Sequence, residues 1–144
     1  MGSCASVAEL PEWARALLDR SRVARLGLLD DAGGPRVLPV TYAVDAGAFV
    51  TAVDYKPKRL PPERLARVRW LRAQPRAALT VDHYDEDWSH LAWVQAIGPV
   101  AIFDAYEVPR AVTALTNRYP QYRDRPPGGP VISLLPDRLI WWRA

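Results

Sequence analysis

Hydrophobic and polar positions alternate along three short segments in the first third of the chain. They cover residues 23–29 (VARLGLL), 36–44 (RVLPVTYAV) and 48–53 (AFVTAV). Alternation with a period of two is typical of strands that have one buried face. Because the intervening turns DDAGGP and DAG are short, the segments predict an antiparallel meander. Pro39 lies inside the second segment, which indicates an edge strand, a bulge, or a place where the backbone faces a ligand.

Three further segments predict strands in the second half of the chain. They are residues 76–82 (RAALTVD), 91–103 (LAWVQAIGPVAIF) and 131–142 (VISLLPDRLIWW). Gly98 lies within the longest of them, where an isolated glycine favours a bulge. We expect the last strand to be interrupted at Pro136, because proline cannot donate to a strand ladder.

Helical spacing of apolar residues appears in three segments: residues 11–20, 63–73 and 107–119. The Pro-rich and Gly-rich residues 120–130 predict a loop. Many short strands with few helices indicate a mainly β (α+β) fold, a small closed or partly open antiparallel barrel with two or three peripheral helices. The chain of 144 residues has no internal repeat and no long linker, so we expect a single domain over residues 1–144.

The one cysteine, Cys4, excludes an intrachain disulfide, which favours a reducing compartment. The chain has no run of about 18 apolar residues and no basic, apolar signal sequence at its start, so a soluble, cytoplasmic protein is expected. The net charge is +3. Basic side chains gather between residues 54 and 76, but residues 82–90 hold four carboxylates and no Lys or Arg. This acidic segment argues against binding of nucleic acid.

The only two lysines, Lys56 and Lys58, lie two positions apart beside Arg59, directly after the predicted strand 48–53. Lysine and arginine side chains at a strand end suit a phosphate or carboxylate. We therefore interpret the segment as an anion clamp, with Thr51 supplying a hydroxyl group. The alternative is a charged loop that only faces solvent.

The segment DHYDEDWSH contains both histidines, His83 and His90, among its carboxylates. Its spacing matches no standard set of metal ligands, so no metal site is predicted; an exposed acidic loop carrying a packed tryptophan is favoured. Trp88, Trp93, Trp141 and Trp142 are candidates for an aromatic stacking surface, although Trp93 and Trp142 fit a core better. Standard catalytic motifs are absent, so any chemistry is expected to come from a cofactor.

The order of the words RVLPVTYAV, FVTAVDYKPKR, RAALTVDHYDEDW and WVQAIGPVAIF resembles the pyridoxamine 5'-phosphate oxidase-like split β-barrel family. More narrowly, the words are similar to its branch of oxidoreductases that use the deazaflavin coenzyme F420. The resemblance implies a homodimer with the cofactor at the interface between subunits. It places the ring near Pro39, Val40 and Thr41, and the phosphate and tail near Thr51, Lys56, Lys58 and Arg59. Trp88 and Ser89 match a Trp-Ser pair that approaches the cofactor.

The resemblance implies hydride transfer between F420 and an unsaturated or conjugated small molecule, which the sequence does not name. Relatives with the same barrel bind flavin mononucleotide (FMN), and the segment DYKPKR favours the deazaflavin without excluding FMN. The alternatives are therefore an FMN-dependent oxidase or reductase and a non-catalytic protein that binds the cofactor. No catalytic residue is identified; His83, Tyr84 and solvent are the candidate proton donors.

Overall fold

The computed structural model describes residues 1–53 and 65–144. Its strands are β1 (Gly2–Cys4), β2 (Ala24–Leu29), β3 (Pro35–Val40), β4 (Ala43–Asp45), β5 (Ala48–Ala52), β6 (Arg76–His83), β7 (Ala92–Phe103), β8 (Val131–Leu134) and β9 (Arg138–Arg143). The helices are α1 (Glu12–Arg20), α2 (Ala66–Ala73), α3 (Pro109–Arg118) and α4 (Pro120–Asp124), with short 3-10 helices η1 (Val7–Glu9), η3 (Trp88–His90) and η4 (Ala105–Glu107). The predicted mainly β fold with peripheral helices is confirmed.

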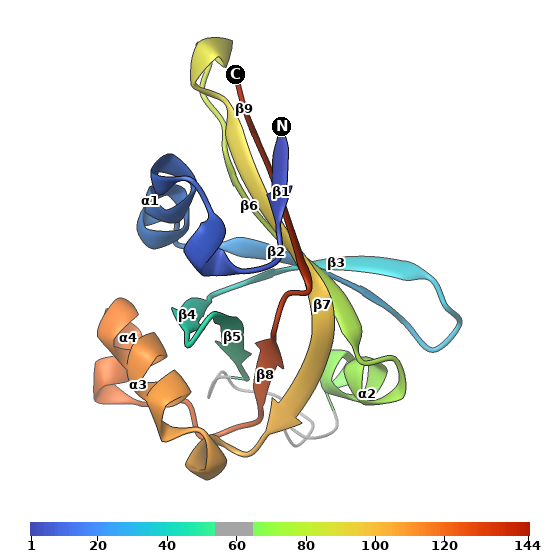
Figure 1. Cartoon of the computed structure of the whole chain (residues 1–144). Coiled ribbons are helices and arrows are strands. Elements are labelled where there is room, and N and C mark those ends of the chain that lie inside the picture. Colours follow the sequence, from blue (N-terminus) through green and yellow to red (C-terminus); the bar gives the residue numbers. More distant parts are fainter. Residues whose placement is uncertain (54–64) are drawn as a thin grey trace.

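The long strand β7 joins two parts of one antiparallel sheet (Figure 1). Its first part pairs with β6 and β9 in the large sheet, which has the order β3-β2-β6-β7-β9-β1. Its last part, from Val100 to Phe103, pairs with β8 in the small sheet, which has the order β7-β8-β5-β4. The end strands β3 and β4 do not pair with each other, so the barrel is open between them, as the term split barrel implies.

The predicted meander is confirmed for its first two strands, because β2 and β3 pair antiparallel, but wrong for its third strand. The segment 36–44 forms two strands, because the chain leaves the large sheet after Val40 and enters the small sheet at Ala43. Strand β5 therefore pairs with β4 and β8 and not with β3. Tyr42 lies at this crossing, where its fully buried ring anchors the chain between the two sheets.

The predicted bulge at Gly98 is also wrong. The ladder between β6 and β7 runs without interruption from Arg76 opposite Pro99 to His83 opposite Ala92. A Cβ atom at Gly98 would lie 2.4 Å from the carbonyl oxygen of Leu135. Glycine is needed here because the connection from β8 to β9 passes directly against the strand. The predicted interruption near Pro136 is confirmed by the same connection.

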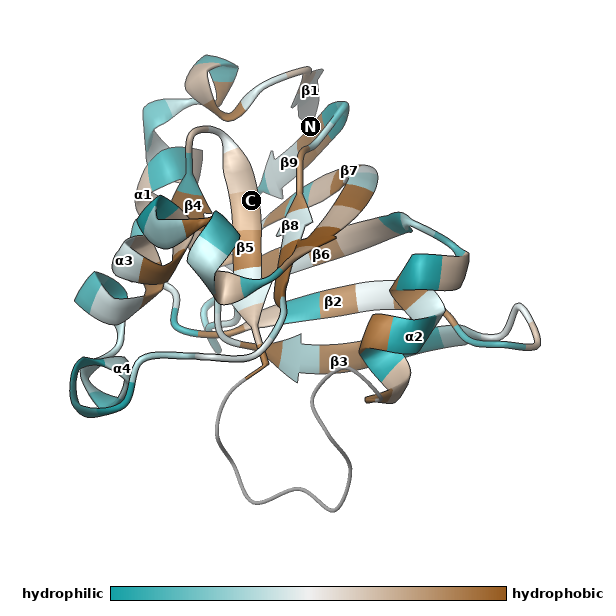
Figure 2. Cartoon of the chain, turned by 90° about the horizontal axis from the view of Figure 1, so that it is seen from below, coloured by the Kyte–Doolittle hydropathy of each residue, from teal (hydrophilic) through white to brown (hydrophobic). Residues whose placement is uncertain are grey.

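Helices α1 and α2 pack on the large sheet, and helices α3 and α4 pack on the small sheet (Figure 2). Helices α1 and α2 cover the inner face of the large sheet, where the main core includes Leu17, Leu26, Leu71 and Leu79. A second apolar cluster lies between α3, α4 and the small sheet. The prediction of a plain loop over residues 120–130 is wrong in its first half, because Pro120 fits the first turn of a helix and begins α4.

Tyr119, the residue between α3 and α4, ties these helices to the crossing between the two sheets. Its buried hydroxyl group accepts a hydrogen bond from the backbone N–H of Tyr42 at 3.0 Å and lies 2.9 Å from the carbonyl oxygen of Arg22, to which it donates. Nearby, Arg118 donates to the carbonyl oxygens of Leu18, Asp19 and Ser21 at the end of α1. Burial raises the pKa of Tyr42 to about 12, with the Arg118 guanidinium acting in the opposite direction.

We expect Tyr119→Phe to lower the free energy of unfolding by about 1–3 kcal/mol, because it leaves the buried N–H of Tyr42 without its acceptor. Chemical denaturation monitored by circular dichroism measures the effect. The matched control is Tyr84→Phe, since Tyr84 is exposed and its hydroxyl group has little burial to lose. Equal stability of the two variants would show that the Tyr119 hydroxyl group does not hold the crossing.

Candidate functional site

The residues predicted to line a cofactor ring lie at the end of β3. Pro39 is exposed and paired with Arg25, Val40 is buried, and Thr41 follows the strand with its Oγ1 3.2 Å from the Tyr122 hydroxyl group. Strand β3 forms an edge of the large sheet. Of the three settings predicted for Pro39, the edge strand is therefore confirmed, because a proline there removes no needed ladder donor.

The residues predicted to bind the cofactor phosphate lie around the end of β5. Thr51 is in β5, opposite Ile132 of β8, and it is only 3% exposed. Lys56, Lys58 and Arg59 lie outside the described residues. Their role as an anion clamp stays a prediction.

Trp88 and Ser89 lie in η3, at the tip of the hairpin formed by β6 and β7. Trp88 is 68% exposed, whereas Ser89 is fixed by Asp87, whose Oδ1 accepts hydrogen bonds from the Ser89 N–H and hydroxyl groups at 3.0 and 2.7 Å. These two bonds also hold the pKa of Asp87 below its usual range. Figure 1 shows the hairpin tip at the top of the view, far above β5. One chain therefore does not bring Trp88 and Ser89 together with Thr51.

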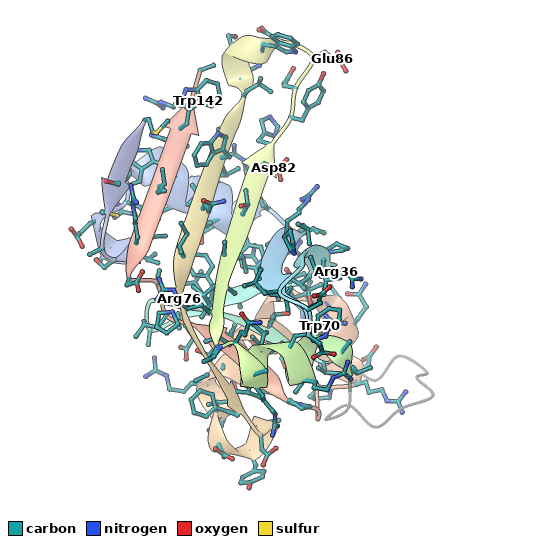
Figure 3. All side chains as sticks on the ribbon, turned by 90° about the vertical axis from the view of Figure 1, so that its right-hand side faces the viewer. Arg36, Trp70, Arg76, Asp82, Glu86 and Trp142 are labelled. Carbon is teal, nitrogen blue, oxygen red and sulfur yellow. The ribbon has the colours of Figure 1, made fainter. Side chains whose placement is uncertain are left out.

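The large sheet has an outer face, formed by the side chains that alternate with the buried ones. Trp93 of β7 and Trp142 of β9 are directly paired on it, and both are half-buried. The same face continues through Ile140 and Ile97 to Val37 of β3, which is 67% exposed. In Figure 3 this face of β9, β7 and β6 is turned to the viewer, with α1 behind the strands and no described helix in front of them at Trp142 and Asp82.

Two pairs of polar side chains on the outer face interact within the chain. Gln95 Nε2 donates to Thr80 Oγ1 at 3.0 Å, and the Arg25 guanidinium lies 3.2 Å from the Asp82 carboxylate. The face is therefore mixed: aromatic and aliphatic side chains surround a few satisfied polar groups. The sequence did not separate this surface from a core, because half-buried tryptophans on a strand follow the same alternating pattern as buried ones.

Residues 11–130 match the model of the family described as pyridoxamine 5'-phosphate oxidase. The chain belongs to the pyridoxamine 5'-phosphate oxidase-like family. Its sequence matches no curated protein.

Solved structures of other proteins share the fold of this chain. The conserved hypothetical protein Rv2991 from Mycobacterium tuberculosis has a TM-score of 0.75 and 18% identity, over 93% of this chain and 85% of that one. A heme binding protein from Mycobacterium smegmatis has a TM-score of 0.71 and 21% identity, over 92% of this chain and 55% of that one. A protein described as F420 reductase has a TM-score of 0.69 and 20% identity, over 91% and 98%. At these identities the likeness establishes the fold.

Within this family fold, the two candidate proton donors lie near the hairpin tip and not at the end of β3. His83 is the last residue of β6, with its Nε2 3.9 Å from Asp85 Oδ2, and Tyr84 is exposed. Across residues 1–53 and 65–144, no group of three or more His, Cys, Asp and Glu side chains is arranged to hold a metal ion. Nor does that part of the chain contain a helix with the length and apolar character needed to cross a membrane.

Proposed function

We propose that this protein is a cytoplasmic, homodimeric oxidoreductase that binds F420 between its subunits. The observation that carries the proposal is the separation of the predicted site residues. Pro39 and Thr41 lie at one edge of the large sheet, and Trp88 lies at the tip of the hairpin. The outer face, which no described helix covers at Trp142 and Asp82, lies on the same sheet. A second copy packed against this face would let residues from two chains approach one cofactor.

The apolar composition of the outer face supports a second copy of the chain as its partner. Cores of protein interfaces are rich in tryptophan and aliphatic side chains and poor in unpaired charge. Trp93, Trp142 and Val37 have this character, and the nearby Arg25 and Asp82 already neutralise each other. Symmetric dimers use the same patch on both subunits, which fits a face with a largely apolar surface.

F420, when bound, would supply the hydride chemistry, and the residues of this chain would position it. In this proposal, the backbone at Pro39–Thr41 borders the ring, and Lys56, Lys58 and Arg59 neutralise the phosphate and the start of the tail. Trp88, which is exposed in the single chain, would cover the ring and exclude water from it. The substrate in this proposal is a small unsaturated or conjugated molecule. The alternatives are an FMN-dependent oxidase or reductase of the same fold and a protein that binds the cofactor without catalysis.

We expect Lys58→Ala to weaken F420 binding by about tenfold to a hundredfold, because it removes a charge-assisted hydrogen bond of roughly 1.5–3 kcal/mol. Fluorescence titration of the bound cofactor measures this. The matched control is Arg69→Ala in α2, since the Arg69 guanidinium is engaged by Asp31 at 3.1 Å. Equal, small losses in the two variants would show that the basic segment only faces solvent.

Turnover separates an oxidoreductase from a protein that only binds the cofactor. Reduced F420 bound to the protein is mixed with a panel of conjugated acceptors, and its oxidation is followed by absorbance. The proposal expects oxidation faster than in free solution with at least one acceptor, because the protein orients the reacting groups. Binding without faster oxidation across the panel would favour the non-catalytic alternative.

A further inference from the structure

A pocket of about 470 Å³ lies between α1 and the tip of the β6–β7 hairpin, on the inner side of the large sheet. In Figure 1, α1 stands beside the upper part of β6. The pocket is therefore on the opposite side of the sheet from the outer face. Of the residues predicted to bind the cofactor, only Ser89 lines it. Its volume is within the range of small-molecule sites.

Basic side chains dominate the wall of this pocket. Arg20 comes from the last turn of α1, Arg143 from β9, and His83 and His90 from the two sides of the hairpin tip. The one acidic side chain of the lining is Asp85. His83 and His90 are the only histidines of the chain, so all of its imidazole groups line this one pocket.

Asp85 organises the histidine side of the pocket. Its Oδ1 accepts a hydrogen bond from the Asp87 N–H at 2.8 Å, and its Oδ2 lies 3.3 Å from His90 Nδ1 and 3.9 Å from His83 Nε2. The hydrogen bond from Asp87, followed by the contacts with the histidines, holds the pKa of the Asp85 carboxyl below its usual range. Asp85 faces one nitrogen of each imidazole, and the other nitrogen has no hydrogen-bonded partner within the described residues.

The arginine side of the pocket also has unused donors. The guanidinium of Arg143 is 5.1 Å from the centre of the Trp13 ring. This cation–π contact holds the guanidinium in place and leaves the N–H groups of Arg143 able to donate to a ligand. Neither Arg143 nor Arg20 forms an ion pair with a carboxylate in the described part of the chain, in contrast to Arg25, Arg69 and Arg76. Trp13, Leu91 and Ala92 add apolar wall, which strengthens the attraction of these charges for an anion.

We propose that this pocket binds a small organic anion bearing a carboxylate or phosphate group. The anionic group would accept hydrogen bonds from Arg20 and Arg143, and the imidazoles of His83 and His90 would contact it from the opposite wall. This inference does not depend on the cofactor proposal, because the four side chains that would contact the anion belong to a single chain and none of them is predicted to bind the cofactor.

The test follows the two histidine side chains by NMR, since each imidazole gives a separate signal that reports on the pocket. Citrate and inorganic phosphate are added separately to the full chain without cofactor, at constant pH and constant ionic strength. We expect saturable shifts of both imidazoles with a dissociation constant of about 1 mM or below for at least one anion. Saturation by citrate alone assigns carboxylate recognition, and saturation by phosphate alone assigns phosphate recognition.

The double variant Arg20→Ala/Arg143→Ala should bind the same anion at least tenfold more weakly. Arg138→Ala is the matched control, because Arg138 is an exposed arginine of the same strand β9 that does not line the pocket. Thermal unfolding of all variants confirms that they are folded. Failure of both anions to give saturable shifts at about 20 mM, or unchanged affinity in the folded double variant, would overturn the proposal.

Discussion

Replacing Trp93 with arginine should convert the proposed dimer into a monomer. An aromatic residue at the centre of an interface contributes roughly 2 kcal/mol or more, and an arginine there would bury an unpaired charge. A symmetric dimer contains the residue twice, so the loss is about 4 kcal/mol and the dissociation constant should rise about a thousandfold. Light scattering at micromolar concentration measures the change, and F420 affinity should fall with it.

Two further variants make the result specific to the outer face. Val37→Arg changes an exposed side chain of the same face, so it should also weaken the dimer but leave the stability of the single chain nearly unchanged. Tyr106→Arg alters an exposed residue of η4 and should leave the dimer intact. A wild-type protein that is monomeric at micromolar concentration and still binds F420 at full affinity would contradict a site shared between subunits.

Gly98→Ala should lower the free energy of unfolding by about 3 kcal/mol. The added Cβ would lie 2.4 Å from the Leu135 carbonyl oxygen and 2.8 Å from Pro136 Cα, which are backbone atoms that cannot rotate away. Relief requires a shift of the β8–β9 connection, which is held by the hydrogen bond from the Asp137 N–H to the Ile97 carbonyl oxygen at 3.0 Å. Overpacking of this kind typically costs 1–3 kcal/mol and occasionally more.

The control for this substitution is Gly27→Ala in β2. A Cβ atom there would lie 3.6 Å from the Ala78 carbonyl oxygen, an ordinary contact distance, so its effect should be within about 1 kcal/mol. Denaturant titration of both variants compares the two sites. Similar stabilities would show that the close approach at Gly98 is relieved without cost.

Local sequence patterns predicted most helices and strands of the fold, because these elements depend on the spacing of apolar residues and on the positions of proline and glycine. Strands β2, β6 and β7, helices α1 and α3, and the break at Pro136 followed from such patterns. The hairpin of β2 and β3 also followed from them. The pairing of β5 did not, because the segment 36–44 keeps one alternating pattern while its backbone passes from the large sheet to the small one at Tyr42. Gly98 likewise looks like a bulge in the sequence, since the connection that presses against it comes from nearly 40 residues later in the chain.

The sequence predicted which residue types would form the candidate site, but not how the fold arranges them. Lys56 and Lys58 stand out because they are the only lysines in the chain, and Trp88 stands out because it matches a residue of the family that the sequence resembles. The outer face was missed because it is assembled from alternate residues of several strands. The proposed anion pocket was missed because its lining comes from α1, the hairpin tip and the end of β9. His83 and Arg143, for example, are 60 positions apart and meet only once β6, β7 and β9 are paired.

We propose that this member of the pyridoxamine 5'-phosphate oxidase-like family binds F420 in preference to flavin. The most direct test of this proposal is a pair of fluorescence titrations of the purified protein, one with F420 and one with FMN, under the same salt conditions. We expect saturable binding of F420 that is at least about tenfold tighter than binding of FMN, and that weakens as salt is added. Tighter binding of FMN, or no saturable binding of F420, would contradict it.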